Sequence, residues 1–307
     1  MANLKLQAGQ TVVITGAGSG FGLELARLAA AKGLNLVLTD VQQDALDAAV
    51  AELSAVGVQV AALRGDVSRA EDVQALADLC MERFGAPHVV INNAGVAHGG
   101  LIWEHTQRDW EWVLRVNLFG VVHGLRVFMP LMLEAARQDP TWQGHMVNVA
   151  SMAGLLNSPN MGAYNVSKHA VVSLSETLYQ DLALVTDQVH ASVLCPYFVP
   201  TGIHLSHRNR PAELRSEGKP TASQMIAQAM STKAVTSGRV TAADTAQLVF
   251  NAIEAGQFYV YTHPQALGMV QTRLEDVVQA RNPTDPFAGK PELGEQLRKA
   301  LREAMKD

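Results

Sequence analysis

The stretch Thr11-Val-Val-Ile-Thr-Gly-Ala-Gly-Ser-Gly-Phe-Gly22 sets the architecture of the chain. It joins a short strand of β-branched residues to a glycine-rich turn, and residues 23–31 continue with the apolar spacing of a helix. In a strand–turn–helix unit of this kind, backbone N–H groups and the helix N-terminus can hold a pyrophosphate. Gly16, Gly20 and Gly22 follow the spacing T-G-x-x-x-G-x-G rather than G-x-G-x-x-G.

Strand and helix patterns alternate along the rest of the chain. This alternation predicts an α/β fold, a Rossmann-type doubly wound parallel sheet of about seven strands with helices on both faces. Further strands are expected at residues 34–39, 58–63, 88–91, 146–150, 191–195 and 258–262. Further helices are expected at residues 44–56, 106–133, 162–185 and 241–255.

Two local signals indicate where helices begin and end. Ser68 is followed three residues later by Glu71, which is a capping-box pattern and predicts a helix from Ser68 to about Phe84. Pro130 has no backbone N–H, and we expect it to end or kink the helix of residues 106–133.

We expect residues 1–262 to form one domain, with residues 263–307 as a helical extension packed on it. Two apolar stripes at helical spacing in the extension favour packing against the body of the protein or a subunit partner. Inside the domain, residues 197–238 form a long insertion with a single helical piece around residues 222–230. An insertion of this length is typical of a lid over a functional site.

The composition limits the classes of function. The 307 residues are 48% hydrophobic and 17% charged, with a formal net charge of −5 and no basic stripe, so no nucleic-acid partner is expected. The apolar residues 116–133 are interrupted by polar side chains, and no membrane span or signal peptide is expected. Cys80 and Cys195 predict buried thiols in a reducing cytoplasm. His204 and His207 have no third ligand at a suitable spacing, so no metal site is expected.

Tyr164 and Lys168 are four residues apart in the expected helix of residues 162–185. Side chains at i and i+4 lie on one helix face about 5–6 Å apart, so a phenol would lie beside an ammonium group. A free tyrosine has a pKa near ~10, and a neighbouring cation lowers it, which favours proton transfer near neutral pH. The pair alone is a weak signal. Ser151, thirteen residues earlier, and Asn92-Asn-Ala-Gly95, after a predicted strand, strengthen it.

With these motifs in this order, residues 8–262 resemble the short-chain dehydrogenase/reductase family, in its single-domain branch with Y-x-x-x-K. The resemblance implies that the Tyr164 phenolate removes the hydroxyl proton of an alcohol while hydride moves to a nicotinamide. Lys168 would keep the phenolate charged and bind the nicotinamide ribose, and Ser151 would hold the substrate oxygen. Asn117, in V-N-L-F-G, matches a family asparagine whose backbone carbonyl holds a water in a proton relay. The family also implies a homodimer or homotetramer.

Asp40 indicates NAD rather than NADP as the cofactor. It ends the second predicted strand about 20 residues after the glycine turn, where a carboxylate accepts hydrogen bonds from the ribose hydroxyls and repels a 2′-phosphate. No basic residue at Ser19, Val41 or Gln42 offsets that charge. The residues expected to bind the cofactor are Gly16, Ser19, Gly20, Phe21, Gly22, Asp40, Val41, Asp66, Val67, Asn92, Ala94, Gly95, Tyr164, Lys168, Pro196, Val199 and Thr201. For residues 92–95 the alternative is a structural role, in which the Asn side chains tie adjacent strands together.

One motif departs from the family pattern. Where P-G-x-V-x-T is common after the sixth strand, this chain has Pro196-Tyr-Phe-Val-Pro-Thr201. Val199 and Thr201 still match, whereas Tyr197 in the glycine position raises the question of which backbone angles the turn adopts.

These features predict a cytoplasmic NAD-dependent oxidoreductase acting on a secondary alcohol or its ketone. The alternatives are an NADPH-dependent carbonyl reductase, which Asp40 disfavours, and an NAD-binding regulator, which would need only the glycine turn. A nucleotide-sugar epimerase shares Y-x-x-x-K, but the glycine spacing and short C-terminal region fit it poorly. Apolar residues near the site favour a lipophilic or aromatic substrate: Met152, Leu155, Leu156, Met161, Phe198 and Trp103.

Overall fold

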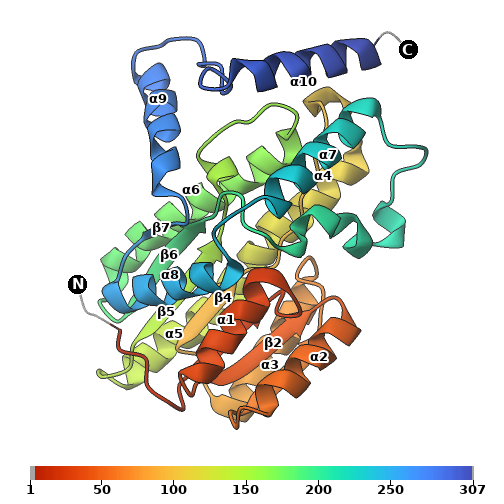
Figure 1. Cartoon of the computed structure of the whole chain (residues 1–307). Coiled ribbons are helices and arrows are strands. Elements are labelled where there is room, and N and C mark those ends of the chain that lie inside the picture. Colours follow the sequence, from red (N-terminus) through yellow and green to blue (C-terminus); the bar gives the residue numbers. More distant parts are fainter. Residues whose placement is uncertain (1–3, 306–307) are drawn as a thin grey trace.

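The structure, a computed structural model, describes residues 4–305, so the expected domain limits at residues 1 and 307 lie outside it. Seven parallel strands form one sheet in the order β3-β2-β1-β4-β5-β6-β7 (Figure 1). The predicted doubly wound α/β fold is confirmed. The strands are β1 (Thr11–Thr15), β2 (Asn35–Asp40), β3 (Val60–Arg64), β4 (Val89–Asn92), β5 (Gly144–Val149), β6 (Val189–Cys195) and β7 (Tyr259–Tyr261).

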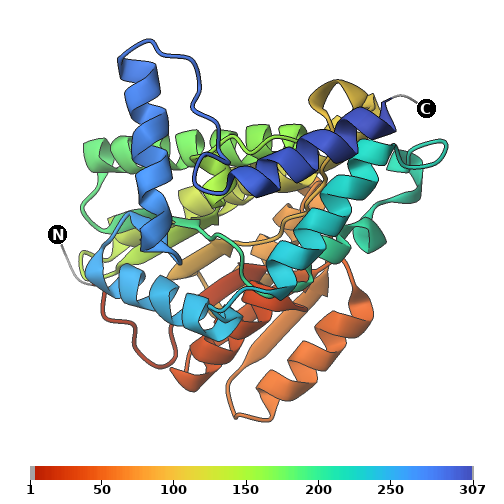
Figure 2. The same cartoon turned by 45° about the horizontal axis from the view of Figure 1, so that its top comes forward.

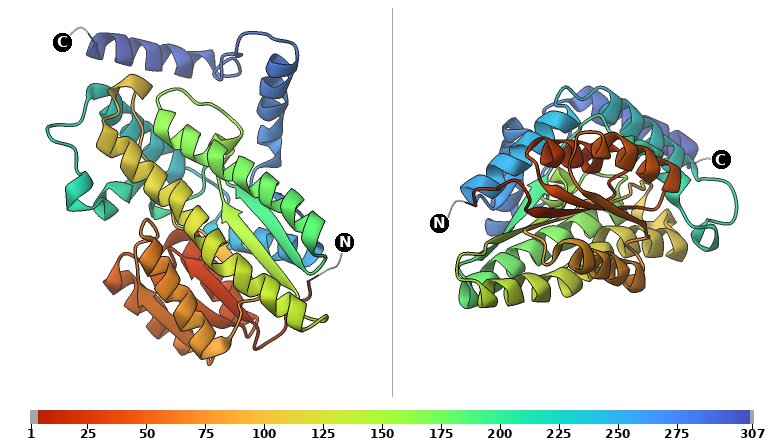
Figure 3. Two further views of the ribbon diagram at one scale, coloured as in Figure 1. Left: turned by 180° about the vertical axis from the view of Figure 1, so that it is seen from behind. Right: turned by 90° about the horizontal axis from the view of Figure 1, so that it is seen from below.

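Helices cover both faces of the sheet (Figure 3). Alternate residues of β1 show why: Val12 and Ile14 pack in one buried apolar cluster, and Val13 packs in another on the opposite face. The first cluster includes residues of α1 (Gly20–Ala31), α2 (Gln43–Ser54) and α8 (Ala242–Ala255). The second includes residues of α3 (Ala70–Phe84), α5 (Gly120–Gln138) and α6 (Gly162–Val185).

The helix expected at residues 106–133 is longer than predicted, and Pro130 does not end it. α4 (Gln107–Leu114) continues through a π-helical turn, Arg115–Phe119, into α5, which contains Pro130. Phe128 and Met132 on the inner face of α5 are fully buried on the sheet. Their packing outweighs the loss of one backbone hydrogen bond at the proline.

By length and composition alone, the continuous helix Gln107–Gln138 could cross a membrane. It has 32 residues, and the mean hydropathy of its most apolar window is 1.5. Such a helix is weak grounds for a membrane span, because core helices of soluble proteins also meet these criteria, and this one packs against α3 and α6. The expectation of no membrane span therefore stays a prediction.

The capping box expected at Ser68 is wrong. α3 begins at Ala70, and no side chain caps its N-terminus. The Ser68 N–H instead donates to Asp66 Oδ1 at 2.9 Å, and the Asp66 N–H donates to Asp72 Oδ2 at 2.9 Å. The turn that Asp66 stabilises occupies Ser68, so the helix begins two residues later.

The C-terminal half supplies the elements above the sheet. Between β6 and α8 lie η4 (Gly202–Asn209), η5 (Ala212–Leu214) and α7 (Ala222–Thr236). After β7, the predicted helical extension is confirmed as α9 (Leu267–Val278) and α10 (Pro291–Ala304). α9 stands up from the body, and α10 extends from the side of α9 across to α7, against which it packs (Figures 1 and 2).

Candidate active site

A cavity of about 1660 Å³ lies above the C-terminal ends of the strands. The chain reverses its winding direction between β1 and β4, and ligands of doubly wound folds bind at this switch point. Most of the predicted site residues line the cavity. They are Gly16, Ser19, Gly20, Phe21, Asp40, Val41, Asp66, Val67, Ala94, Gly95, Ser151, Tyr164, Lys168, Pro196, Val199 and Thr201.

The glycine turn is built for close approach of backbone groups. Gly16 and Gly20 have φ angles of +66° and +56°, which residues other than glycine rarely adopt. A Cβ on Gly22 would lie 2.0 Å from the Gly16 carbonyl oxygen. Gly22 does not line the cavity, and its contact with a cofactor stays a prediction. Its role in the structure is to let the first turn of α1 pack against the loop.

The Asn-Asn-Ala-Gly turn fixes the other side of this loop. Asn93 Nδ2 donates to the carbonyl oxygens of Thr15 and Gly16 at 2.8 and 3.2 Å, and Thr15 Oγ1 accepts the N–H groups of Asn93 and Ala94. Asn92 is only 3% exposed and donates to Asn148 Oδ1 on the neighbouring strand. Asn92 therefore ties two strands together. It does not line the cavity, and its contact with the cofactor stays a prediction.

Asp40 lies at the rim of the cavity in a fixed orientation. Its Oδ2 accepts the Gly18 N–H and its Oδ1 accepts the Gln42 N–H, both at 2.9 Å. Asp40 has one basic neighbour that was not predicted. Arg64, paired with Asp40 across the sheet, donates from Nε to the Val41 carbonyl at 3.1 Å. Arg64 itself does not line the cavity.

Ser151, Tyr164 and Lys168 meet on one wall of the cavity. Ser151 caps the short helix η3 (Met152–Gly154), with its Oγ accepting the Ala153 N–H at 3.1 Å. Tyr164 and Lys168 lie in α6 and are 8% and 3% exposed. Lys168 Nζ donates to the Val149 carbonyl at 2.9 Å and lies 5.9 Å from the centre of the Tyr164 ring.

The expected lowering of the Tyr164 pKa is not found in the chain by itself. Burial raises the pKa of Tyr164, and the Ser151 hydroxyl opposes this only in part. Burial also lowers the pKa of Lys168 to about 8. For both residues, the loss of hydration of the charged form has a larger effect on the pKa than the attraction between phenolate and ammonium. The spacing of Tyr164 and Lys168 in the sequence does not show how deeply they are buried.

Asn117 is buried beside the site and does not line the cavity. It lies in the π-helical turn between α4 and α5. Its Oδ1 accepts the Val96 N–H at 2.8 Å, and its Nδ2 donates to the Val96 carbonyl and to Ser167 Oγ. The side chain therefore joins the loop after β4 to α6, the helix that carries Tyr164.

Tyr197 answers the question raised by its position. Gly-only backbone angles are not needed there, because Asn160 and Ala280 are the only non-glycine residues with positive φ within residues 4–305. The Tyr197 N–H donates to Thr262 Oγ1 at 3.0 Å, and its ring lies 4.3 Å from the Phe198 ring centre. An aromatic pair thus replaces the usual open turn beside the cavity.

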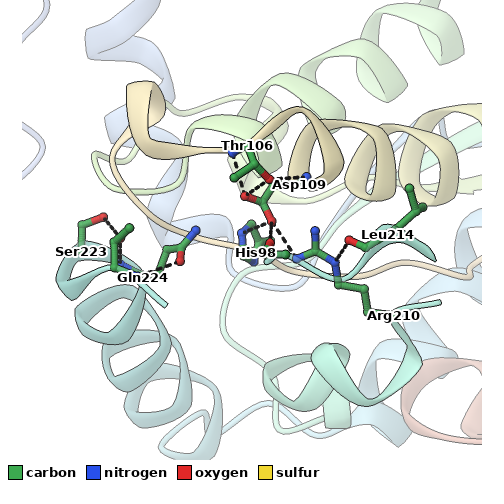
Figure 4. A network of polar contacts seen from close by, with 9 residues as sticks. His98, Thr106, Asp109, Arg210, Leu214, Ser223 and Gln224 are labelled. Atoms are coloured by element: carbon green, nitrogen blue, oxygen red, sulfur yellow. Dashed lines mark hydrogen bonds and ion pairs between the residues drawn. The ribbon is translucent and has the colours of Figure 1, made fainter. Parts of the chain in front are cut away.

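A buried polar network holds the segment after η4 against α4 (Figure 4). Asp109 is fully buried, and its Oδ1 forms an ion pair with Arg210 at 2.7 Å and accepts a hydrogen bond from Ser216 Oγ at 3.0 Å. Its Oδ2 caps α4 by accepting the Thr106 N–H, and His98 Nε2 lies 3.2 Å from Oδ1. Burial alone would raise the pKa of Asp109, but these donors hold it far below its usual value.

The network was not predicted. Thr106-x-x-Asp109 is a capping-box pattern and could have identified Asp109 as a capping residue. No local pattern predicts its pairing with Arg210, about a hundred residues later. His98, His105 and Asp109 also place possible metal-ligand atoms within 4.8 Å of one another. Because the Arg210 guanidinium already contacts Asp109, a metal ion there would face a positive charge. We interpret the group as an anchor for the segment.

Comparison with known proteins decides the family. Residues 10–211 match the family described as short chain dehydrogenase. The chain belongs to the short-chain dehydrogenase/reductase family. It is therefore an oxidoreductase of a family that uses NAD or NADP as cofactor.

Similar short-chain dehydrogenases extend over most of the chain. A crystal structure of one from Burkholderia phymatum, in complex with NAD, is 50% identical and covers 92% of this chain and 99% of its own, with a TM-score of 0.89. A CLA biosynthesis dehydrogenase/reductase from Lactiplantibacillus plantarum is 32% identical over 88% of this chain and 93% of its own. A 1-deoxy-11-beta-hydroxypentalenate dehydrogenase from Streptomyces avermitilis is 34% identical, covering 87% of each chain.

In this short-chain dehydrogenase, the tail also contributes to the cavity, which sequence reasoning missed. The expected apolar neighbours Met152, Leu156, Met161 and Phe198 line the cavity, whereas Leu155 and Trp103 do not. The lining residues that the tail supplies come from α9, α10 and the loop between them, and include Met269, Arg273, Phe287, Leu293 and Leu297. The apolar stripes of the tail predicted only that its helices pack against the body or a partner. One face of a helix can pack while the adjacent face lines a cavity.

Proposed function

We propose that the chain is an NAD-dependent oxidoreductase that transfers a hydride between a secondary alcohol or ketone and the nicotinamide, with Tyr164 as the acid–base group. The observation that carries the proposal is the meeting of Ser151, Tyr164 and Lys168 on one wall of a cavity whose other end is the glycine turn. A regulator would need the turn alone.

The cavity fits a dinucleotide. Gly16 and Gly20 allow a close backbone approach at the turn, and the N-terminus of α1 points a helix dipole towards an anion. Asp40 is oriented by two backbone N–H groups, and a carboxylate there suits two ribose hydroxyls and repels a 2′-phosphate. The Burkholderia phymatum relative in complex with NAD supports the same choice. An NADPH-dependent carbonyl reductase is the alternative, and it would have to tolerate the Asp40 charge.

The residues at the wall have separate roles in this proposal. NAD, when bound, supplies the acceptor for the hydride. Ser151 holds the substrate oxygen, and Tyr164 takes the hydroxyl proton of the alcohol or returns it to the ketone. Lys168 stabilises the phenolate, and the Val149 carbonyl keeps its ammonium in place. Asn117 supports the Tyr164 helix with its side chain, and its backbone carbonyl is proposed to hold a relay water.

The substrate side of the cavity favours a lipophilic molecule. Met152, Leu156, Met161, Phe198 and Met230 supply apolar surface there. The Streptomyces avermitilis relative is named for a hydroxylated pentalenate, which is consistent with a hydrocarbon skeleton that carries an alcohol. We propose a lipophilic or aromatic secondary alcohol. We further propose that residues 197–238 act as a lid, that the protein is cytoplasmic, and that it forms a homodimer or homotetramer.

The test is a panel of lipophilic secondary alcohols, assayed by the absorbance of reduced cofactor with NAD and with NADP. We expect at least one alcohol to reduce NAD, and Tyr164→Phe to remove that activity. A purified, folded protein that binds NAD but oxidises no alcohol and reduces no ketone would favour the regulator. A clear preference for NADP would favour the carbonyl reductase.

A further inference from the structure

The substrate half of the cavity is the half away from the glycine turn, where the substrate is proposed to bind. It contains an arginine, Arg273, whose charge no carboxylate of the described residues neutralises. One face of α9 lines the cavity with Met269, Thr272, Arg273, Asp276 and Val277. Arg273 is half-buried on this face and forms no ion pair or side-chain hydrogen bond within residues 4–305. A half-buried guanidinium that faces a cavity without a counter-charge is free to pair with an anion that arrives with the ligand.

The carboxylates that could neutralise Arg273 are already engaged. Asp276, one turn further along α9, is buried and accepts hydrogen bonds from Arg281 Nε at 3.0 Å and from the Thr284 N–H at 2.9 Å. Asp285 accepts from Arg298 at 2.8 Å. The remaining carboxylates that line the cavity, Asp40 and Asp66, follow β2 and β3 at the nucleotide end. The substrate half therefore keeps an excess of positive charge.

Arg273 lies on the side of the cavity where the proposed chemistry occurs. Val270, on the adjacent face of α9, packs in the same apolar cluster as Met152, the residue after Ser151. The Arg273 charge also reaches His169, which follows Lys168 in α6. Burial is the main cause of the lowered pKa of His169, and Arg273 adds to it. Arg273 and the Ser151–Tyr164–Lys168 wall thus line the same cavity.

We infer that the substrate carries a carboxylate, and that Arg273 binds it while the apolar lining holds a hydrocarbon skeleton between the carboxylate and the alcohol. This inference rests on the proposed function, because it names the substrate class of the same site. The planar guanidinium matches a carboxylate with two parallel hydrogen bonds. Arg281, the next cation along α9 and its loop, is held by Asp276. The other cavity-lining cations without a side-chain partner in residues 4–305 are exposed, whereas Arg273 is half-buried; they are Arg208, Lys233, Arg239 and Lys290.

The first experiment measures binding and does not depend on turnover. The protein saturated with NADH is titrated with decanoate and with the uncharged decanamide by calorimetry. We expect decanoate to bind at least about tenfold more tightly, since hydrogen bonds to a charged partner contribute about 1.5–3 kcal/mol. Arg273→Gln should remove this preference, and Arg273→Lys should keep part of it. Arg302→Gln, which removes an exposed charge from α10 outside the cavity, is the matched control.

The second experiment compares the oxidation of 9-hydroxydecanoic acid, its methyl ester and 2-decanol. In the unaltered enzyme the acid should have the highest kcat/KM, through a lower KM. Arg273→Gln should bring the kcat/KM values of acid and ester together, whereas Arg302→Gln should keep their difference. Equal binding of decanoate and decanamide would overturn the inference, as would a preference that survives Arg273→Gln. If decanoate is preferred but no alcohol reduces NAD, the proposed function fails and the carboxylate site stands. If alcohols are oxidised with no preference for the acid, the proposed function stands and the carboxylate site is refuted.

Discussion

The Asp109 carboxylate and the Arg210 guanidinium form an ion pair of 2.7 Å although their side chains are only 0% and 9% exposed. The pair joins α4 to the connection between η4 and η5. Arg210 also lies 5.0 Å from the centre of the Trp112 ring, and its Nε donates to the Leu214 carbonyl at 2.6 Å. The pair thus fixes the proposed lid, residues 197–238, to α4 by a buried contact.

Asp109→Asn should destabilise the protein strongly, because it leaves Arg210 buried without a counter-charge. Breaking one partner of a buried ion pair reduces the free energy of unfolding by about 3–5 kcal/mol, which urea denaturation can measure. Arg108→Gln, which breaks the exposed Arg108–Glu217 pair, should change it by less than about 1 kcal/mol. Because the pKa of Asp109 is held below its usual value, its contribution is complete above pH ~4 and is lost as the pH falls further. Similar losses in the two variants would contradict this account.

Asp40→Ser should weaken the preference for NAD over NADP. In the unaltered protein the like charge at Asp40 should give NAD an advantage of at least about tenfold, or about 1.4 kcal/mol. Fluorescence titration with both cofactors measures the two dissociation constants. Asp44→Ser removes an exposed carboxylate from the first turn of α2 outside the cavity and should leave the ratio unchanged. Equal affinities in the unaltered protein would refute the assignment.

The sheet and the nucleotide end of the site could be predicted because short-range patterns encode them. Buried parallel strands are continuous apolar runs, and the glycine turn needs particular residues at fixed spacing. Local rules failed where a competing contact decided the outcome. The Ser68 N–H donates to Asp66 in a turn, so Ser68 does not cap α3. Phe128 and Met132 pack on the sheet, so α5 continues beyond Pro130.

The substrate end of the site depends on long-range contacts, which leave no local signal. The spacing of Tyr164 and Lys168 predicted their common face, but their pKa values depend on burial beneath segments distant in sequence. Asp109 and Arg210 are 101 positions apart by their residue numbers, and Arg273 reaches the cavity from the tail. In each case only the tertiary structure brings the groups together.

The apolar side chains exposed on α5 and α6 predict self-association. Phe119 is 48% exposed at the start of α5, and Val166 and Leu184 on α6 are 45% and 83% exposed. Surfaces of this kind are commonly covered in symmetric oligomers. Light scattering at micromolar concentration should give the mass of a dimer or tetramer, and Phe119→Glu with Val166→Glu should lower it. A monomeric mass for the unaltered protein would refute the prediction.

Lys168 should make stability depend on pH in a predictable window. Burial lowers its pKa to about 8, whereas the unfolded chain keeps a value near ~10.4. Between these values the unfolded state binds more protons, so the contribution of Lys168 to stability rises with pH and is constant below pH ~8. Unfolding of the cofactor-free protein and of Lys168→Met should be compared from pH 7 to 10. Any advantage of Lys168→Met should shrink as the pH rises, and a constant difference would show that the lysine is not buried as described.

Tyr164→Phe should remove turnover and leave NAD binding nearly intact. The ring, which is 8% exposed in α6, keeps its packing in the variant, so the fold and the glycine turn should not change. The change removes only the hydroxyl that exchanges a proton with the substrate, and a positioned acid–base group typically contributes ~10²–10⁴ in rate. The measurement is kcat with the best alcohol from the panel, together with the dissociation constant of NAD.

Lys168→Ala should act differently, because its ammonium is proposed to stabilise the phenolate and to bind the cofactor. Turnover and NAD affinity should therefore fall together, whereas in Tyr164→Phe only turnover falls. In the unaltered enzyme, oxidation should rise with pH as the phenolate forms. Since burial raises the pKa of Tyr164 in the cofactor-free chain, bound NAD must lower it if the rise occurs below the value of a free tyrosine. If Tyr164→Phe keeps most of the activity, the proton is exchanged elsewhere and the assignment of this wall is wrong.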